Sequence, residues 1–140
     1  MRVLAIVKAS KESEESVAPS TEEMLEMGRF NDEMIKSGIM LAGEGLLPSK
    51  KGVRVMYEGK KRAVMDGPFA ETKELVAGFW ILQVKSMEEA VEWLKRAPFH
   101  EGNVELRPIA EMEDFGEAMT PEVRAQEERQ RRELESQKRK

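Results

Sequence analysis

The chain has 140 residues, which is the size of one domain with a hydrophobic core of its own, and a formal net charge of −4, which argues against nucleic acid as a partner. The absence of cysteine excludes disulfides, thiolate nucleophiles and cysteine-based metal sites, and a single histidine argues against a multi-histidine centre. The apolar run at residues 3–7 is too short for a signal peptide or a membrane span, so we expect a cytoplasmic protein with no membrane partner.

The first predicted element is a strand over residues 2–8, whose continuous apolar run is typical of a strand buried on both faces. Residues 9–19 are polar and predict a loop. Ser20 and Glu23 then form a capping-box pattern that starts a helix, and Gly38 ends this helix with a left-handed cap.

A second strand is predicted from Ile39, and we expect Gly43-Glu44-Gly45 to interrupt it with a bend or a close backbone approach. Residues 53–57 alternate between apolar and polar side chains, Glu58-Gly59-Lys60 predicts a turn, and residues 61–65 return along the first strand, so together they predict a β-hairpin. A sharp turn is expected directly after the hairpin.

The second half of the chain begins with an apolar strand over residues 76–85 and a helix over 86–97, which a capping box of Ser86 and Glu89 starts. A last strand is predicted over residues 103–110. The final stretch carries seven basic and five acidic side chains but little apolar surface. We therefore expect one domain at 1–119 and a charged C-terminal tail at 120–140, helical or disordered.

Together these elements predict an α+β fold with the ferredoxin-like split βαβ arrangement and an inserted β-hairpin. Both helices of that arrangement cover one face of the sheet, whereas the strands at 3–7 and 76–84 are apolar on both faces. The simplest cover for the other face is the same face of a second copy, so we expect a homodimer with two-fold symmetry.

The densest group of chemically useful side chains lies just before the strand at 76–85, in Asp66-Gly67-Pro68-Phe69-Ala70-Glu71-Thr72-Lys73-Glu74. Asp66 is a candidate general acid or base, and Thr72 and Lys73 are candidates for binding an anionic or carbonyl group of a substrate. The alternative is structural: Asp66 accepts N–H groups of a turn, and the charged side chains after it face solvent.

Glu44 is the second catalytic candidate, because a carboxylate between two glycines is an unusual choice for packing. A carboxylate that points into an apolar pocket holds its proton more readily, which suits proton transfer. In the alternative reading the glycines form a bulge and Glu44 faces water. Arg54 is expected on the hairpin face opposite Val53 and Val55, where it either binds a substrate carboxylate or is solvated.

Asp66 and Glu44 together are candidates for a two-carboxylate acid–base pair or for oxygen ligands of a hard cation. No metal-ligand spacing accompanies them, so we expect neither a metal nor another cofactor. His100 follows the second predicted helix in a loop, where a lone histidine is expected at the surface.

The nine-residue motif that starts at Asp66 resembles the motif of the YCII-related family in its DGPF-type branch. The resemblance extends over about residues 1–122. It rests on further segments that stand where that family has them: Ala42-Gly43-Glu44-Gly45-Leu46, Lys51-Gly52-Val53-Arg54-Val55, Gly78-Phe79-Trp80, Glu105-Leu106-Arg107-Pro108, Glu113-Asp114-Phe115-Gly116-Glu117 and Thr120-Pro121-Glu122.

The resemblance implies a dimeric α+β barrel with a cleft for a small-molecule ligand. It also implies a link to extracytoplasmic-function sigma factors, because some members are encoded with or fused to them. In the wider family a His–Asp pair is the suggested catalytic element, and Asp66 matches its aspartate. The first predicted helix contains no histidine, so any catalysis falls to Glu44, Asp66 and Lys73.

Three functions stay open at this point. The first is a cofactor-independent enzyme in which a carboxylate moves a proton during isomerisation or elimination, with Thr72, Lys73 and Arg54 holding the substrate. The second is a non-catalytic module that binds a metabolite or a transcription partner. The third is a structural role in which the motif only builds a turn.

Overall fold

The computed structural model describes residues 1–138, and the chain divides into two compact units, Met1–Pro108 and a second unit from Ile109 onward. The elements of the first unit are β1 (Arg2–Lys8), α1 (Lys11–Glu14), α2 (Thr21–Lys36), β2 (Met40–Gly45), η1 (Ser49–Lys51), β3 (Val53–Glu58), β4 (Lys61–Asp66), η2 (Thr72–Glu74), β5 (Val76–Gln83), α3 (Met87–Leu94) and β6 (Val104–Pro108). The second unit contains η3 (Met112–Ala118) and α4 (Pro121–Lys138). In the described chain, no helix is both long enough and apolar enough to cross a membrane.

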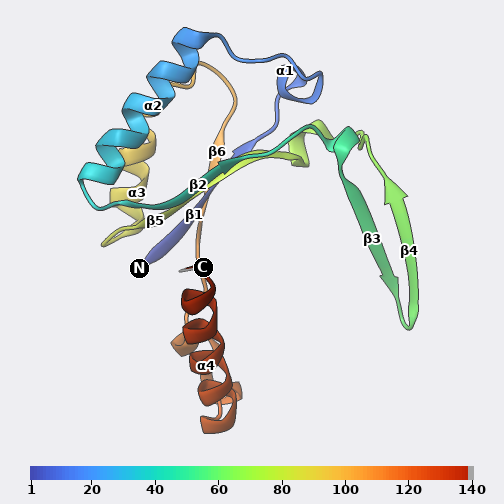
Figure 1. Ribbon diagram of the computed structural model, residues 1–140, viewed down its shortest axis with the longest axis vertical. Helices are drawn as coiled ribbons and strands as arrows, with labels where there is room; N and C mark the ends of the chain where they lie inside the picture. The colour runs from blue at the N-terminus through green and yellow to red at the C-terminus, as the bar shows by residue number, and fades with distance from the viewer. Residues whose placement is uncertain (139–140) are drawn as a thin grey trace. The chain divides into compact units, whose positions relative to one another are not determined.

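Four strands form the main sheet in the order β2-β5-β1-β6, and every neighbouring pair is antiparallel (Figure 1). The helices α2 and α3 follow the first and third strands of this sheet in chain order. The predicted α+β class is therefore confirmed, and the strand order matches the ferredoxin-like arrangement. The hairpin β3–β4 is inserted before β5 as a separate two-stranded sheet.

One face of the main sheet is covered by α2 and α3 (Figure 1). Trp80 lies on this face, with its ring edge-on to Phe30 of α2 and its indole N–H donating to the Asn31 side chain at 3.0 Å. Among the described residues, nine hydrophobic side chains are buried in this layer: Val3, Ala5, Phe30, Met34, Ile39, Trp80, Leu82, Val84 and Ala90.

The opposite face of the sheet is also apolar. The register places Leu4 beside Ile81 and Ile6 beside Phe79, and all four side chains are only half-buried. The helices α2 and α3 both lie on the other side of the sheet. The prediction that β1 and β5 are apolar on both faces is confirmed. The apolar periodicity of the sequence also favours a core position for Phe79, but its side chain belongs to this open face.

The helix ends largely follow the sequence pattern. Ser20 and Glu23 form the predicted reciprocal capping box of α2, and Gly38 has the left-handed φ of 72° that the predicted cap requires. The capping box of α3 is only half formed: Ser86 accepts the N–H of Glu89, but the Glu89 carboxylate accepts the N–H of Lys85 and not that of Ser86.

Two sequence interpretations were wrong in detail. Gly43-Glu44-Gly45 does not interrupt the second strand, because β2 runs through it and the irregularity lies between Met40 and Ala42. The glycine is needed because a Cβ at Gly43 would lie 2.7 Å from Cδ1 of Trp80. The predicted loop at 9–19 contains the short helix α1, which Ser10 and Ser13 cap reciprocally.

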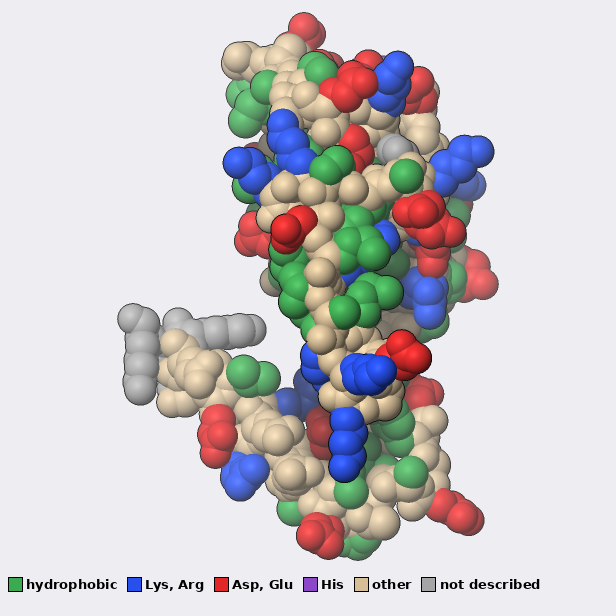
Figure 2. Space-filling view, turned by 90° about the vertical axis from the view of Figure 1, so that its right-hand side faces the viewer, with side chains coloured by type: hydrophobic (Ala, Val, Ile, Leu, Met, Phe, Trp, Pro, Cys, Tyr) green, Lys and Arg blue, Asp and Glu red, His purple; other side chains and the backbone are tan. Residues whose placement is uncertain are grey.

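The hairpin β3–β4 has exposed hydrophobic side chains on both of its faces. Its turn lies at Gly59-Lys60, as predicted, and Gly59 has a φ of 59°. Figure 2 shows hydrophobic side chains gathered on the side of the molecule that carries the hairpin. The exposed hydrophobic residues of the hairpin are Val53, Val55, Met56, Tyr57, Val64 and Met65.

The second unit is dominated by α4, whose side chains are mostly exposed. Thr120 caps this helix by accepting the N–H of Val123, and Arg129 pairs with Glu133 one turn further on. The segment expected to be helical or disordered is thus helical through Lys138, and its last two residues lie outside the described residues.

Candidate functional site

The turn after the hairpin is built on close backbone contacts. Gly67 donates its N–H to the Gly52 carbonyl at 3.0 Å, and its peptide bond to Pro68 is cis. A Cβ at Gly67 would lie 1.8 Å from the carbonyl oxygen of Ser49, so only glycine fits at this position. The glycine of the motif therefore brings the end of β4 against η1.

Ser49 connects this turn to the start of the chain. Its hydroxyl accepts the N–H of Phe69 at 3.1 Å and donates to the carboxylate of Glu14. The Ser49 N–H donates to the same carboxylate at 2.9 Å. Arg54 then stacks its guanidinium over the Phe69 ring, 3.8 Å from the ring centre. These contacts fix the base of the hairpin. Arg54 and the motif residue Phe69 were singled out from the sequence, whereas Ser49 and Glu14 were not.

Asp66 ends β4 opposite Val53, at the base of the hairpin. Its side chain is exposed, and no hydrogen bond or ion pair to its carboxylate occurs among the described residues. The turn N–H groups that follow it are satisfied by Gly52 and Ser49 instead. The carboxylate is consequently available to a ligand and is not required to hold the turn together.

Glu44 lies on the open face of the sheet, directly across from Phe79. The backbone around Glu44 is closely packed: the Trp80 ring occupies the space beside Gly43, and a Cβ at Gly78 would lie 2.9 Å from the Glu44 carbonyl oxygen. The Glu44 side chain is exposed. It thus stands as a carboxylate next to an apolar surface, without an ion-pair partner in the described part of the chain.

The remaining substrate-binding candidates lie in η2. Lys73 is exposed, and no ion pair holds its ammonium group among the described residues. The side chain of Thr72 lies outside the described residues. Nothing joins Glu44 to Asp66 by a hydrogen bond in the described structure, whereas Arg54 is joined to the motif through Phe69.

A charged cluster at the edge of the open face was not anticipated. Glu105 of β6 accepts from Arg107 at 3.2 Å and pairs with Lys8 of β1 at 3.3 Å. The hydrogen bond from Arg107, followed by the one from Lys8, lowers the pKa of Glu105 below its usual value. Strand alternation could have found this cluster, because Glu105 faces the same side as Ile6.

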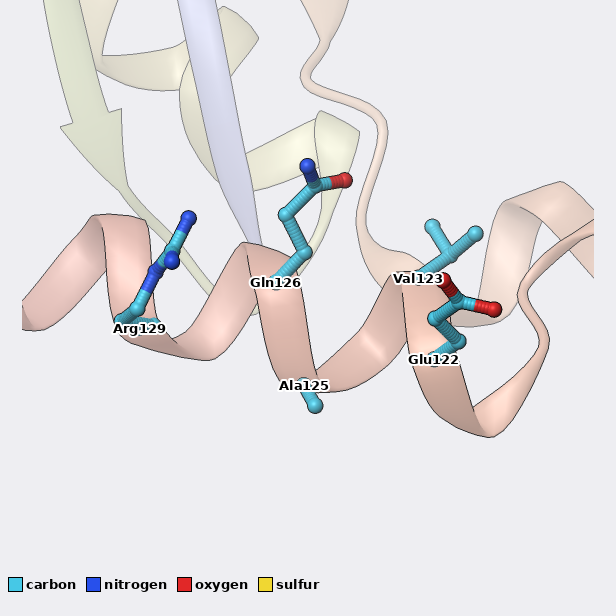
Figure 3. Close-up of a pocket in the computed structure, with 5 residues that line it drawn as sticks. All are labelled: Glu122, Val123, Ala125, Gln126 and Arg129. Carbon is cyan, nitrogen blue, oxygen red and sulfur yellow. The ribbon is translucent and has the colours of Figure 1, made fainter.

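In the described residues, no cluster of three or more acidic or histidine side chains is arranged to hold a metal ion. The second unit has a shallow hollow of about 350 Å³ along α4, lined by Glu122, Val123, Ala125, Gln126 and Arg129 (Figure 3). In Figure 3, Gln126 and Arg129 project from one side of the helix and Ala125 from another. A hollow formed by one helix has no opposing wall, so it supports no binding site.

Comparison with known proteins relates the chain to a family model, to a curated relative and to a solved structure. The model of the YCII-related domain matches residues 1–113. An uncharacterized protein of Rhizobium meliloti (strain 1021) is 31% identical over 104 residues, which are 72% of this chain and 79% of that protein.

The third match is a solved structure. It is the 5-chloro-2-hydroxyhydroquinone dehydrochlorinase of Burkholderia phenoliruptrix AC1100, in complex with 2,5-dihydroxybenzoquinone. The likeness covers 79% of this chain and 94% of that one, with a TM-score of 0.47 and 14% identity. A likeness this loose supports no inference about activity.

Proposed function

Since the chain belongs to the YCII-related family, we propose that it is a homodimer that binds a small molecule on the open face of its sheet, with Glu44 as the acid–base group. The assignment to the DGPF-type branch is part of this proposal. The observation that carries the proposed binding site is the position of Glu44 across from Phe79, on an apolar face that α2 and α3 leave open.

The homodimer follows from the apolar character of that face. Leu4, Ile6, Phe79 and Ile81 form one contiguous patch across β1 and β5. Burying apolar surface stabilises an interface by roughly 25 cal/mol per Å², and two stacked sheets pack about 10 Å apart. The same face of a second copy matches this patch, and two such sheets face to face form the dimeric α+β barrel.

The hairpin gives the dimer additional apolar surface. A two-stranded hairpin alone is marginally stable in water, and its hydrophobic side chains here are exposed on both faces. The turn around Gly67 and Phe69 fixes the hairpin at its base, which gives this part of the motif a positioning role. Asp66, Lys73 and Arg54 lie next to that turn and would hold the polar groups of the ligand, together with Thr72.

The chemistry that this set of groups supports is proton transfer. A carboxylate beside an apolar surface can remove a proton from a bound molecule, and a nearby lysine or arginine can stabilise the resulting anion. Isomerisation and elimination need these steps. The alternative is a non-catalytic module that binds a metabolite or a transcription-linked partner. The absence of a hydrogen bond between Glu44 and Asp66 in the described structure favours this alternative.

Native mass spectrometry tests the proposal. We expect the wild-type protein to be a dimer that retains a defined small molecule, and we expect Phe79→Asp to be a folded monomer that retains none. Leu25→Asp is the matched control, because Leu25 is an exposed apolar residue on α2 and the dimer should survive its replacement. A monomeric wild-type protein would overturn the proposal.

Glu44→Gln separates the enzyme from the binding module. The amide keeps the shape of the side chain but cannot accept a proton. If the retained molecule is converted by the wild-type protein and only bound by Glu44→Gln, Glu44 is the acid–base group. Binding without conversion by both proteins would favour the module.

A further inference from the structure

A cleft of about 870 Å³ opens on the helix-covered side of the sheet, away from the open face. It lies in the first unit, where β1 and β6 meet the loop that follows α3. Glu44, Asp66 and Lys73 do not line it, so it is separate from the site proposed above. Its volume falls within the range of about 300–1,000 Å³ that is typical of small-molecule sites.

The inner surface of this cleft, which we call the α3 cleft, is largely apolar. Its floor is formed by side chains of the sheet and its wall by α3 and the loop after it. The apolar lining residues are Val7, Ala77, Val91, Leu94, Ala97, Pro98, Phe99, Val104 and Leu106. Such a surface favours a ligand with an apolar body.

The charged residues at the rim are unequally paired. Two lysines line the cleft, and both already have carboxylate partners: Lys95 pairs with Glu92 at 3.0 Å, and the ammonium group of Lys8 pairs at 3.3 Å with Glu105 at the edge of the open face. Glu12 of α1 and Glu101 of the loop also line the rim, and no ion pair involves either of them within the described chain. The unpaired charge at the rim is therefore negative.

Phe99 adds a second preference for a cation. Phe99 is 39% exposed and lies in the loop that carries Glu101, and its ring contacts Trp80 edge-on at 6.2 Å between ring centres. A partly exposed aromatic residue and a carboxylate that line the same cleft can attract organic cations through cation–π and ionic contacts together.

We propose that the α3 cleft binds a hydrophobic amine. The apolar body of the amine lies along Val91 and Leu94 of α3, and its ammonium group lies at the rim between the Phe99 ring and the Glu101 carboxylate. An organic acid of the same shape would meet Glu101 and Glu12 with like charge, and the lysines that could compensate it are already paired.

His100 provides a direct measurement of binding. It lines the same cleft and is the only histidine of the sequence, so its ring C–H signals in a proton NMR spectrum need no assignment. The probe is 2-(1-naphthyl)ethylamine, and its matched control is 3-(1-naphthyl)propionate, which has the same ring system but the opposite charge. Calorimetric titrations with both compounds give the affinities.

We expect a saturable shift of the His100 signals with the amine and at least about tenfold weaker binding of the acid. Val91→Trp fills the cleft and should abolish binding of the amine. Leu25→Trp, at an exposed position on α2 outside the cleft, should bind like the wild type. Glu101→Gln should weaken the amine severalfold and leave 2-(1-naphthyl)ethanol unaffected.

Three results would overturn the proposal. The first is an acid that binds as tightly as the amine, and the second is an amine that does not bind at millimolar concentration. The third is unchanged amine binding by Val91→Trp while circular dichroism shows that this variant is folded. None of these results bears on the dimer or on Glu44, because the α3 cleft lies on the other side of the sheet.

Discussion

The two faces of the main sheet differ in what covers them and not in the type of residue that they present. Val3 and Leu82 are fully buried under the helices, whereas Leu4 and Ile81, their neighbours in the same two strands, remain partly exposed. A strand that is apolar on both faces needs a cover on each face, and the helices α2 and α3 cover one of them. The comparison indicates that covering the open face with another molecule or another copy would remove further apolar surface from water and so gain free energy.

The largest expected effect comes from truncating one residue on each face. Leu82→Ala leaves a cavity in the core and should lower the free energy of unfolding by about 2–5 kcal/mol. Ile81→Ala should cost clearly less in dilute protein, because the side chain is already partly exposed. Urea unfolding over a range of protein concentrations measures both variants.

The same pair of variants tests whether a second copy covers the open face. In that case the loss for Ile81→Ala should grow with protein concentration, because the wild-type dimer gains stability by mass action and the variant gains less. Equal losses for both variants in demonstrably monomeric protein would contradict the difference between the two faces.

Gly67→Ala should have the next largest effect, because its Cβ would meet the Ser49 carbonyl oxygen at 1.8 Å. Backbone shifts of this kind typically cost about 1–3 kcal/mol. Compared with the wild type, amide hydrogen exchange in Gly67→Ala should be accelerated more in β3 and β4 than in β1 and β5. Gly45→Ala is the control, since no atom lies within 4 Å of the position of its Cβ. Uniformly unchanged exchange in the hairpin would show that the turn does not hold it.

The fold could be predicted where a local pattern carries the information. The apolar run of β1 and the capping box of α2 gave correct elements, because side-chain period and cap chemistry act within a few residues. The path of β2 could not be predicted. The need for glycine at Gly43 comes from the Trp80 ring of a neighbouring strand, and no local pattern records that contact.

The candidate site could be predicted only as a set of residues. The motif was recognisable, but its link to Ser49 and Glu14 spans 20 and 35 residues of sequence, and such contacts have no local signature. The charge cluster around Glu105 was within reach, because it follows from strand alternation once the order of the strands is known. The catalytic roles of Glu44 and Asp66 stay predictions.

Ser49→Ala should have a smaller effect than Gly67→Ala. It removes the hydroxyl that bonds to Glu14 and to the N–H of Phe69, and the net loss for a hydrogen bond is typically about 1 kcal/mol. Ser13→Ala, which affects only the cap of α1, is the matched control. Thermal unfolding of both variants should rank Ser49→Ala as the less stable. The reverse order would show that the hydrogen bonds of Ser49 to Glu14 and Phe69 contribute little to the stability of the whole unit.

The smallest expected effect concerns Glu105 on the open face, a group with a clearly altered pKa. Its pKa is lowered by the hydrogen bonds from Arg107 and Lys8, so its contribution to stability is present above the pKa of the unfolded chain and is lost as pH falls through the folded value. Arg107→Gln should raise the pKa of Glu105 towards its usual value and flatten the loss of stability in that acidic range. An NMR titration of the Glu105 side chain measures this directly. A pKa that does not move in Arg107→Gln would show that Lys8 alone holds the carboxylate. A decrease in pKa would contradict the contact with Arg107 itself.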